Sequence, residues 1–346
     1  MSAVTPPRGV VFLFGAGASF AVGSTGGNVT PGAPPLMTGL YDALALEFPK
    51  EWGPESRLGP HADEFRQDFE DAFTHRIVQE EYLQSSLTLL EALVPLARFF
   101  AKYSLRPRNH DDLYSRLVAG VADAGALPLT TFGSLNYDCL LELAVDRLGY
   151  GIDWLIEDAR RRLQAMGPPA LARDSVRVAK LHGSCNFVAE LRGSSLSIIC
   201  SPGSTIEAEM RHVWPPSGAI AELSRSYGEN RTFPTMCQLS QRKDSVLSPG
   251  KMTQIRQMWR EAVMSADLVV VIGVRPAAHD EHVWKPLQET AARRCYIGAA
   301  DHFAEWSRAN PAGWSSLGER WEGVDVVLEE VRRAVASETE VEAVRA

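Results

Sequence analysis

Polar residues that could take part in catalysis follow short apolar runs at separate places in the sequence. Asn136 and Asp138 come after a run that ends at Phe132, and His182 follows the run 176–181. An amide and a carboxylate suit recognition of a carboxamide or of ribose hydroxyls. A histidine can act as a general base near neutral pH. If the extended backbone persists, alternation points Asn136 and Asp138 in one direction.

These residues also have structural interpretations, which the residue types alone leave open. Asp138 stands just ahead of an expected helix from Cys139, where it would form an Asx turn or a cap. A lone histidine such as His182 is more often structural than catalytic. His279 and His282 bracket two acidic residues and would share a helix face. Because no third ligand accompanies them at a recognisable spacing, we predict no metal site.

A glycine-rich sequence follows the first apolar run. Residues 15–19 (GAGAS) come directly after Val10–Phe14. Glycines let the backbone approach a diphosphate closely, and free amides then donate to its oxygens. Phe20 takes the place of the third glycine of the dinucleotide fingerprint, and a P-loop is excluded because no Gly-Lys-Ser/Thr follows. The motif therefore fits a nucleotide cradle or a tight strand-to-loop turn.

Buried strands that alternate with helices must position these residues. The apolar runs predict strands at 10–14, 127–132, 176–181, 268–272, 295–297 and 324–327. Helical spacing predicts helices at 36–48, 87–100, 111–122, 139–148, 252–265 and 281–292, with a further apolar stripe of Phe65, Phe69, Phe73 and Ile77. We therefore expect an α/β fold with a Rossmann-like, open, mainly parallel sheet and a helical insertion.

We expect one domain over residues 1–336. It would carry the helical insertion at about 50–125 and a loop-rich segment at about 185–250, and a flexible tail would follow at 337–346. Ligands of such sheets bind beyond the carboxyl ends of the strands. Four of the expected strand ends carry small or polar residues, which are GAGAS, GSLNYD, HGS and GVRP.

Composition narrows the class of protein. The chain has 346 residues, 45% of them hydrophobic and 23% charged, with a net charge of −8, which argues against direct nucleic-acid binding. There is no apolar run long enough for a membrane span and no signal-peptide pattern, so we expect a cytoplasmic protein. The five cysteines include no C-x-x-C pair, which excludes a zinc ribbon and makes a disulfide framework improbable.

Taken together and in order, these motifs resemble the sirtuin-like family. The matching segments are FGAGAS (14–19), PPLM (34–37), FGSLNYD (132–138), KLHGS (180–184) and ADLVVVIG (266–273) followed by Asp280. With a helical region after the first motifs and no zinc ribbon, the chain resembles bacterial sirtuin-like effectors. Many of these consume NAD in anti-phage defence, alone, fused, or encoded beside a HerA-type ATPase or a short Argonaute.

The resemblance implies roles for particular residues. Those that match the loop cradling the NAD diphosphate are Gly15, Ala16, Gly17 and Ser19. Asn136 matches the asparagine beside the nicotinamide ribose, Asp138 the acidic partner near the carboxamide, and His182 the catalytic histidine. Gly273 matches the glycine that lets the adenosine ribose cross the strand end. Val274-Arg275 departs from the family pattern of an aromatic residue and a serine, which puts the adenosine contacts in doubt.

The implied activity is NAD+ glycohydrolase, which cleaves NAD+ to nicotinamide and ADP-ribose, in an abortive-infection system. NAD would be the substrate, with no metal, no direct nucleic-acid contact and no membrane contact. We expect a homo-oligomer, with a HerA-type ATPase or an Argonaute-like protein as a partner. Two alternatives stay open: an NAD-dependent protein deacylase or ADP-ribosyltransferase, and a non-catalytic sensor of NAD or ADP-ribose.

Overall fold

The computed structural model describes most of the chain. The described residues are 9–24, 29–82, 86–106, 111–154, 175–191, 201, 204–212, 227, 231–237, 239, 243, 245–277, 279–309, 313–319 and 323–345. Parts of the loop-rich segment predicted at about 185–250 lie outside them. Among the helices that the structure describes, none is both long and apolar enough to cross a membrane.

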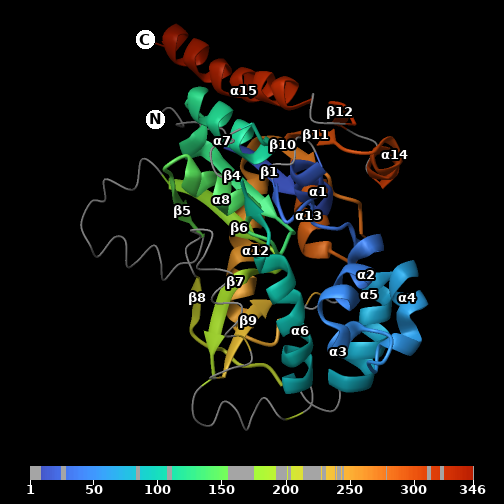
Figure 1. The fold of residues 1–346 in the computed structure, drawn as a ribbon. Helices are drawn as coiled ribbons and strands as arrows, with labels where there is room; N and C mark the ends of the chain where they lie inside the picture. Colours follow the sequence, from blue (N-terminus) through green and yellow to red (C-terminus); the bar gives the residue numbers. More distant parts are fainter. Residues whose placement is uncertain are drawn as a thin grey trace.

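A seven-stranded parallel sheet forms the centre of the molecule (Figure 1). Every strand pairs in parallel with its neighbours, in the order β12-β11-β10-β1-β4-β6-β5. In that order the strands span Trp314–Ser316, Arg293–Ile297, Ala266–Ile272, Gly9–Phe14, Thr130–Ser134, Ser175–Lys180 and Gly151–Asp153. Residues 10–14 are at most 1% exposed. Strand β1 is therefore covered on both faces, which explains its continuous apolar sequence.

The chain leaves the two central strands in opposite directions. From β1 it proceeds to β4 and β6 on one side, and from β10 to β11 and β12 on the other. The carboxyl ends of β1 and β10 therefore form the topological switch point, where open α/β sheets bind their ligands. This strand order confirms the Rossmann-like parallel sheet expected from the sequence.

Helices cover both faces of this sheet. They are α1 (Ala16–Ser24), α7 (Leu113–Asp123), α8 (Leu140–Arg147), α12 (Pro249–Met264), α13 (Glu281–Glu289), α14 (Ala300–Ala309) and α15 (Gly323–Arg345). Tyr114 of α7 packs edge-on against Phe14, which stacks with Phe132 of the next strand. Gly133 points to the opposite face. A Cβ at Gly133 would lie 2.4 Å from the Trp259 ring, so the missing side chain lets α12 pack closely there.

A helical lobe lies between α1 and α7 in the sequence (Figure 1). Its helices are α2 (Met37–Glu47), α3 (Pro49–Trp52), a 3₁₀ turn (Gly59–His61), α4 (Ala62–Gln67), α5 (Phe69–Phe73), a π-helix (Thr74–Tyr82) and α6 (Ser86–Ala101). The predicted stripe is buried in this lobe, where Phe65, Phe73 and Ile77 have no exposed area. The helix is broken at Asp68, whose backbone is extended and whose side chain accepts from the Asp71 amide. The stripe therefore packs within the lobe and is not an assembly surface.

Two smaller antiparallel sheets complete the fold. Strand β7 (Gly183–Glu190) pairs with β8 (Met210–His212) and β9 (Thr232–Met236), and β2 (Val29–Thr30) pairs with β3 (Ser104–Leu105). The three-stranded sheet projects away from the main sheet alongside α6 (Figure 1). Only residues 181 and 182 separate β6 from β7, so His182 lies where the chain passes from one sheet to the other.

Two of the predicted strands were wrong in type or position. Leu127–Leu129 forms a 3₁₀ turn, and β4 begins only at Thr130. Pro128 has no backbone N–H to give to a sheet, which disfavours a central strand at this position. The last strand predicted at 324–327 is instead part of α15. The buried residues Val324, Val327, Leu328 and Val331 have the spacing of a helix face.

Two segments expected to be irregular are helical. The GAGAS motif does not continue into a loop, because α1 begins at Ala16 directly after β1. Helix α15 also runs to Arg345, through most of the tail predicted from 337. The flexibility of that tail stays a prediction.

Candidate functional site

Glycines bring the ends of β1 and β10 into contact at the switch point. The Gly15 amide donates to the Ile272 carbonyl at 3.0 Å, and the Gly17 amide donates to the Gly273 carbonyl at 3.0 Å. A Cβ on Gly273 would lie 2.4 Å from the backbone nitrogen of Ala18. The φ of Gly273 is +63°, a conformation that favours glycine. These glycines allow a close approach of two backbones that a larger residue would prevent.

The same contacts limit how the turn could bind a diphosphate. The amides of Gly15, Gly17 and Ala18 all donate to protein carbonyls. The phosphate-cradle hypothesis requires free amide donors, and these three amides are not free in this arrangement. Ala16 and Ser19, by contrast, line a cavity. An anion at this turn would bind at Ala16 and Ser19 or replace one of the internal hydrogen bonds.

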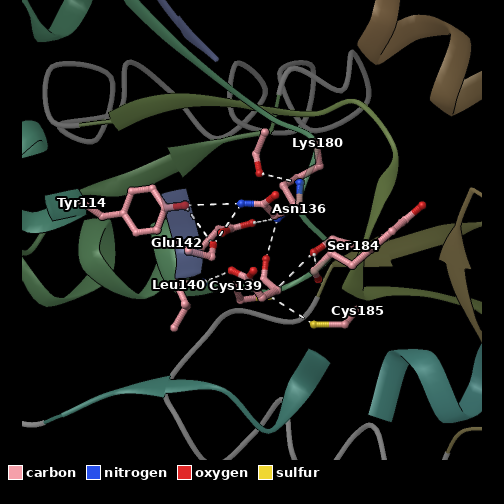
Figure 2. A network of polar contacts seen from close by, with 12 residues as sticks. Tyr114, Asn136, Cys139, Leu140, Glu142, Lys180, Ser184 and Cys185 are labelled. Atoms are coloured by element: carbon pink, nitrogen blue, oxygen red, sulfur yellow. Dashed lines mark hydrogen bonds and ion pairs between the residues drawn. The ribbon is translucent and has the colours of Figure 1, made fainter. Parts of the chain in front are cut away.

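Asn136 follows β4 and is held by the glycine-rich turn and, as Figure 2 shows, by Tyr114 of α7. Its Nδ2 donates to the Gly15 carbonyl at 2.9 Å and to Ser19 Oγ at 3.0 Å, while Tyr114 OH lies 3.0 Å from the same Oγ. The residue is 7% exposed. Its Oδ1 accepts no hydrogen bond from the described part of the chain. The protein thus fixes the donor end of the amide and leaves the acceptor oxygen available.

A cavity of about 60 Å³ adjoins Asn136. Its walls come from α1, the start of α2, α6 and the loop after β4, and are formed by Ala16, Ser19, Pro34, Pro35, Met37, Leu40, Phe100, Leu135, Asn136, Tyr137, Asp138 and Leu239. Asn136 and Asp138 share this cavity, but Leu135 and Tyr137 line it as well. Strand β4 ends at Ser134, so the alternation expected of an extended backbone does not account for their common direction. The volume suits a few water molecules.

Asp138 forms the Asx turn that its position ahead of a helix suggested. Its Oδ1 accepts from the Leu140 amide at 3.1 Å, an Asx turn at the start of α8. Behind it, the Lys180 ammonium donates to the Asp138 carbonyl at 2.6 Å and lies 3.0 Å from Glu142 Oε1 (Figure 2). The side chains of Lys180 and Glu142 are fully buried. This ion pair fixes the backbone that carries Asn136 and Asp138.

His182 faces two residues from the start of α13. Its Nε2 lies 3.5 Å from Asp280 Oδ1, and its ring centroid lies 5.2 Å from that of His282. Burial lowers the pKa of His182 and outweighs the nearby Asp280 carboxylate, which acts to raise it. Burial also lowers the pKa of His282, to about 2. Both imidazoles are therefore neutral at physiological pH and can offer a lone pair.

A second charged group stands next to this cluster. The Glu70 carboxylate, from the helical lobe, forms ion pairs with the Lys243 ammonium and with His279, whose Nε2 lies 2.8 Å from Glu70 Oε2. The close Glu70 carboxylate raises the pKa of His279. His279 and His282 therefore have different partners, although sequence spacing suggested that they share one helix face. Helix α13 begins at Glu281, after His279, which accounts for the difference.

The predicted residues thus fall into two neighbouring groups. Asn136 and Asp138 line the cavity, together with the Ala16 and Ser19 of the turn, whereas His182 does not line it. Tyr137 stands between the groups. It contributes to the cavity wall, and its ring centroid lies 6.4 Å from that of His182.

Sequence reasoning missed several contacts of this site. Tyr114 reaches Ser19 and Asn136 from α7, and no motif singled it out. Asp280 and His282 were noted, but not as neighbours of His182. Strands β1 and β4 separate β10 from β6, so the proximity arises only in the folded protein, where the chain after β10 comes back to the end of β6.

The departure from the family pattern at Val274-Arg275 has a local explanation. Val274 is buried, and its Cγ2 would lie 2.8 Å from a Cβ on Gly15, so a small apolar residue fits against the turn. The Arg275 side chain is 71% exposed and lies 3.7 Å from Glu305 of α14. It does not line the described cavity.

Comparison with known proteins gave similarities to solved structures only. No family model and no curated protein matches the chain. A structure described as a basis for the mechanism and regulation of Sir2 enzymes is 13% identical, with a TM-score of 0.46, over 97% of this chain and 95% of that chain. A mutant Sir2 homologue in complex with ADP-ribose is 15% identical, with a TM-score of 0.42, over 96% and 95%. A mutant homologue with 2'-O-acetyl ADP-ribose is 15% identical, with a TM-score of 0.39, over 97% and 95%.

Proposed function

We propose that this chain is an NAD+ glycohydrolase, which cleaves NAD+ with water to nicotinamide and ADP-ribose. The observation that carries the proposal is the setting of Asn136. Its amide nitrogen is tied to Gly15 and Ser19 at the switch point of the sheet, while the residue itself lines the adjacent cavity. A polar side chain fixed in this way can hold a reacting group in one orientation.

The chemistry requires little beyond positioning and one proton acceptor. Nicotinamide leaves as a neutral group, so the reaction needs a water molecule aligned with the anomeric carbon of the ribose. Asn136 Oδ1 would accept a hydrogen bond from that water or from a ribose hydroxyl. Neutral His182 would take the proton that the water loses as it bonds to the anomeric carbon. Positioning and general-base catalysis each contribute about 10²–10⁴-fold to rates of this kind.

The spacing of the cysteines favours hydrolysis over protein deacylation. The family resemblance links deacylases with a zinc ribbon that supports the acyl-peptide side of the cleft. The sequence contains no C-x-x-C pair. In the structure, the sulfur atoms of Cys139 and Cys185 lie 3.6 Å apart in the core. Cys237 and Cys295 are also buried, and both are more than fifty residues further along the chain. The acceptor that we propose is therefore water.

The proposal is tested by the loss of NAD+ with the purified full chain and with two variants, each assayed with and without the product of the neighbouring gene. We expect Asn136→Ala and His182→Ala each to lower nicotinamide release by at least ~100-fold, because each removes a positioning or base contribution. Unfolding curves would verify that both variants fold. His75→Ala, at an exposed histidine of the π-helix, is the matched control and should retain full activity. Turnover near the wild-type rate in either site variant would contradict the assignment.

We further propose that the activity belongs to an anti-phage defence system. An enzyme that depletes NAD must be inactive until it is triggered, so we expect control by self-association or by a partner such as a HerA-type ATPase or an Argonaute-like protein. The support is the resemblance of the motifs to bacterial effectors. The test is the NAD content of phage-infected cells that express the wild-type chain or Asn136→Ala, with and without the product of the neighbouring gene. Equal NAD loss in cells that express the wild-type chain and in cells that express Asn136→Ala would contradict this role.

A further inference from the structure

His182, Asp280 and His282 form a set of three potential metal ligands. Their ligand atoms all lie within 4.8 Å of one another, although His182 comes from the end of β6 and the other two from the start of α13. Two imidazoles and one carboxylate are a ligand set that proteins use for zinc and for other divalent transition metals. Three protein ligands would leave the fourth position of a tetrahedral zinc open to water or a substrate.

These groups lack other partners in the described structure. His182 Nε2, His282 Nε2 and Asp280 Oδ1 are all buried and take part in no hydrogen bond. The 3.5 Å between His182 and Asp280 is long for a hydrogen bond. A buried polar atom without a partner destabilises the folded protein. One cation bound between the three atoms would satisfy all of them together.

The surroundings fix the backbone that carries His182, and the nearby lysine has a counter-charge of its own. The His182 carbonyl accepts from the Cys237 amide at 2.8 Å, and Arg256 Nε donates to the adjacent Leu181 carbonyl at 3.1 Å. The nearby Lys243 ammonium forms an ion pair with Glu70, and its charge also acts on Asp280. The ligand atoms would need to close to the ~3.3 Å that bonds of 2.0–2.1 Å impose.

We propose that His182, Asp280 and His282 form a binding site for one divalent transition-metal ion of the zinc type. The site would also regulate the enzyme, and this regulatory role rests on the proposed function. A metal bound at His182 Nε2 occupies the lone pair that would accept the proton of the attacking water. Metal binding and NAD+ cleavage are then mutually exclusive at this histidine.

Cobalt(II) provides a direct test, because its visible absorption reports coordination by protein ligands. The full chain, treated with EDTA and dialysed, should bind one Co²⁺ per chain, and Zn²⁺ should displace it. Asp280→Ala and His282→Ala should each weaken binding by at least ~100-fold, since losing a ligand costs at least as much as losing a residue that supports one. Unfolding curves without metal would verify that both variants fold.

His279→Ala is the matched control. This histidine is next to Asp280 in the sequence but is bound by Glu70, so its removal should leave Co²⁺ binding unchanged. Absence of the Co²⁺ spectrum in the wild-type chain would overturn the site, as would equal losses in His279→Ala and His282→Ala.

The regulatory part has a separate readout. Zn²⁺ should suppress nicotinamide release by wild type and by His279→Ala over the same concentration range in which it displaces Co²⁺, and EDTA should restore it. Co²⁺ binding with unchanged NAD+ cleavage would overturn the regulation and leave the site. Co²⁺ binding by a chain that never cleaves NAD+ would contradict the proposed function and leave the site intact.

Discussion

At the scale of single residues, the site depends on side chains that are fixed by contacts outside the reacting atoms. Asn136 is positioned by Gly15 and Ser19, and Ser19 is in turn held by Tyr114 of α7. Such a chain of hydrogen bonds fixes the orientation of the Asn136 amide, and therefore the direction of its free oxygen.

Removing the Tyr114 hydroxyl tests this chain of contacts. Tyr114→Phe should lower the rate of NAD+ cleavage roughly tenfold, because Ser19 and Asn136 lose a tether while the cavity keeps its shape. It should also lower the free energy of unfolding by about 1 kcal/mol. Tyr227→Phe is the control, since Tyr227 is a buried tyrosine whose hydroxyl donates to Cys185 in the three-stranded sheet. An equal effect of both substitutions on the rate would contradict the positioning role.

Gly273 tests the close approach of the strand ends. In Gly273→Ala the new Cβ meets Ala18 nitrogen at 2.4 Å and the residue has φ +63°, so we expect a loss of roughly 3 kcal/mol in the free energy of unfolding. Gly125→Ala has a similar φ of +69° but nothing within 4 Å, and should cost about 1–2 kcal/mol. Thermal or urea unfolding measures both, and equal losses would show that the contact with α1 is unimportant.

At the scale of elements, a buried ion pair joins β6 to α8. Lys180 and Glu142 have fully buried side chains with 3.0 Å between their charged atoms. Lys180→Met leaves the Glu142 carboxylate without its counter-charge, and we expect it to lower the free energy of unfolding by about 3–5 kcal/mol.

The double variant distinguishes a paired charge from simple loss of packing. Lys180→Met with Glu142→Leu should recover most of the loss, because no charge stays buried alone. Recovery will be incomplete, since Lys180 also donates to the Asp138 carbonyl. Urea unfolding of the two single variants and the double variant gives the coupling energy. If the losses simply add, the two residues do not act as a pair.

Elements buried on both faces could be predicted from the sequence, whereas short apolar runs could not be assigned reliably. Strands β1 and β10 have no polar face, so their apolar runs and their small terminal residues were evident. The run at 324–327 is interrupted by Asp325, and its spacing with Leu328 and Val331 suits a helix. The meeting of His182 with His282 depends on the order of strands in the sheet, which no local pattern specifies.

At the scale of the whole molecule, the sheet brings the ends of distant strands together at one edge. The carboxyl ends of β1 and β10 are where three segments meet: the glycine-rich turn, the loop that carries Asn136, and Gly273. His182 lies at the junction with the three-stranded sheet, beside the start of α13.

The products of NAD+ turnover test the central claim most directly. Purified full chain would be incubated with NAD+, with and without the product of the neighbouring gene, and nicotinamide and ADP-ribose would be quantified against time. Hydrolysis predicts the two products in equal amounts, with no acylated peptide or protein acceptor added. Nicotinamide release that occurs only with an acylated peptide, or ADP-ribose that ends up attached to protein, would contradict the account.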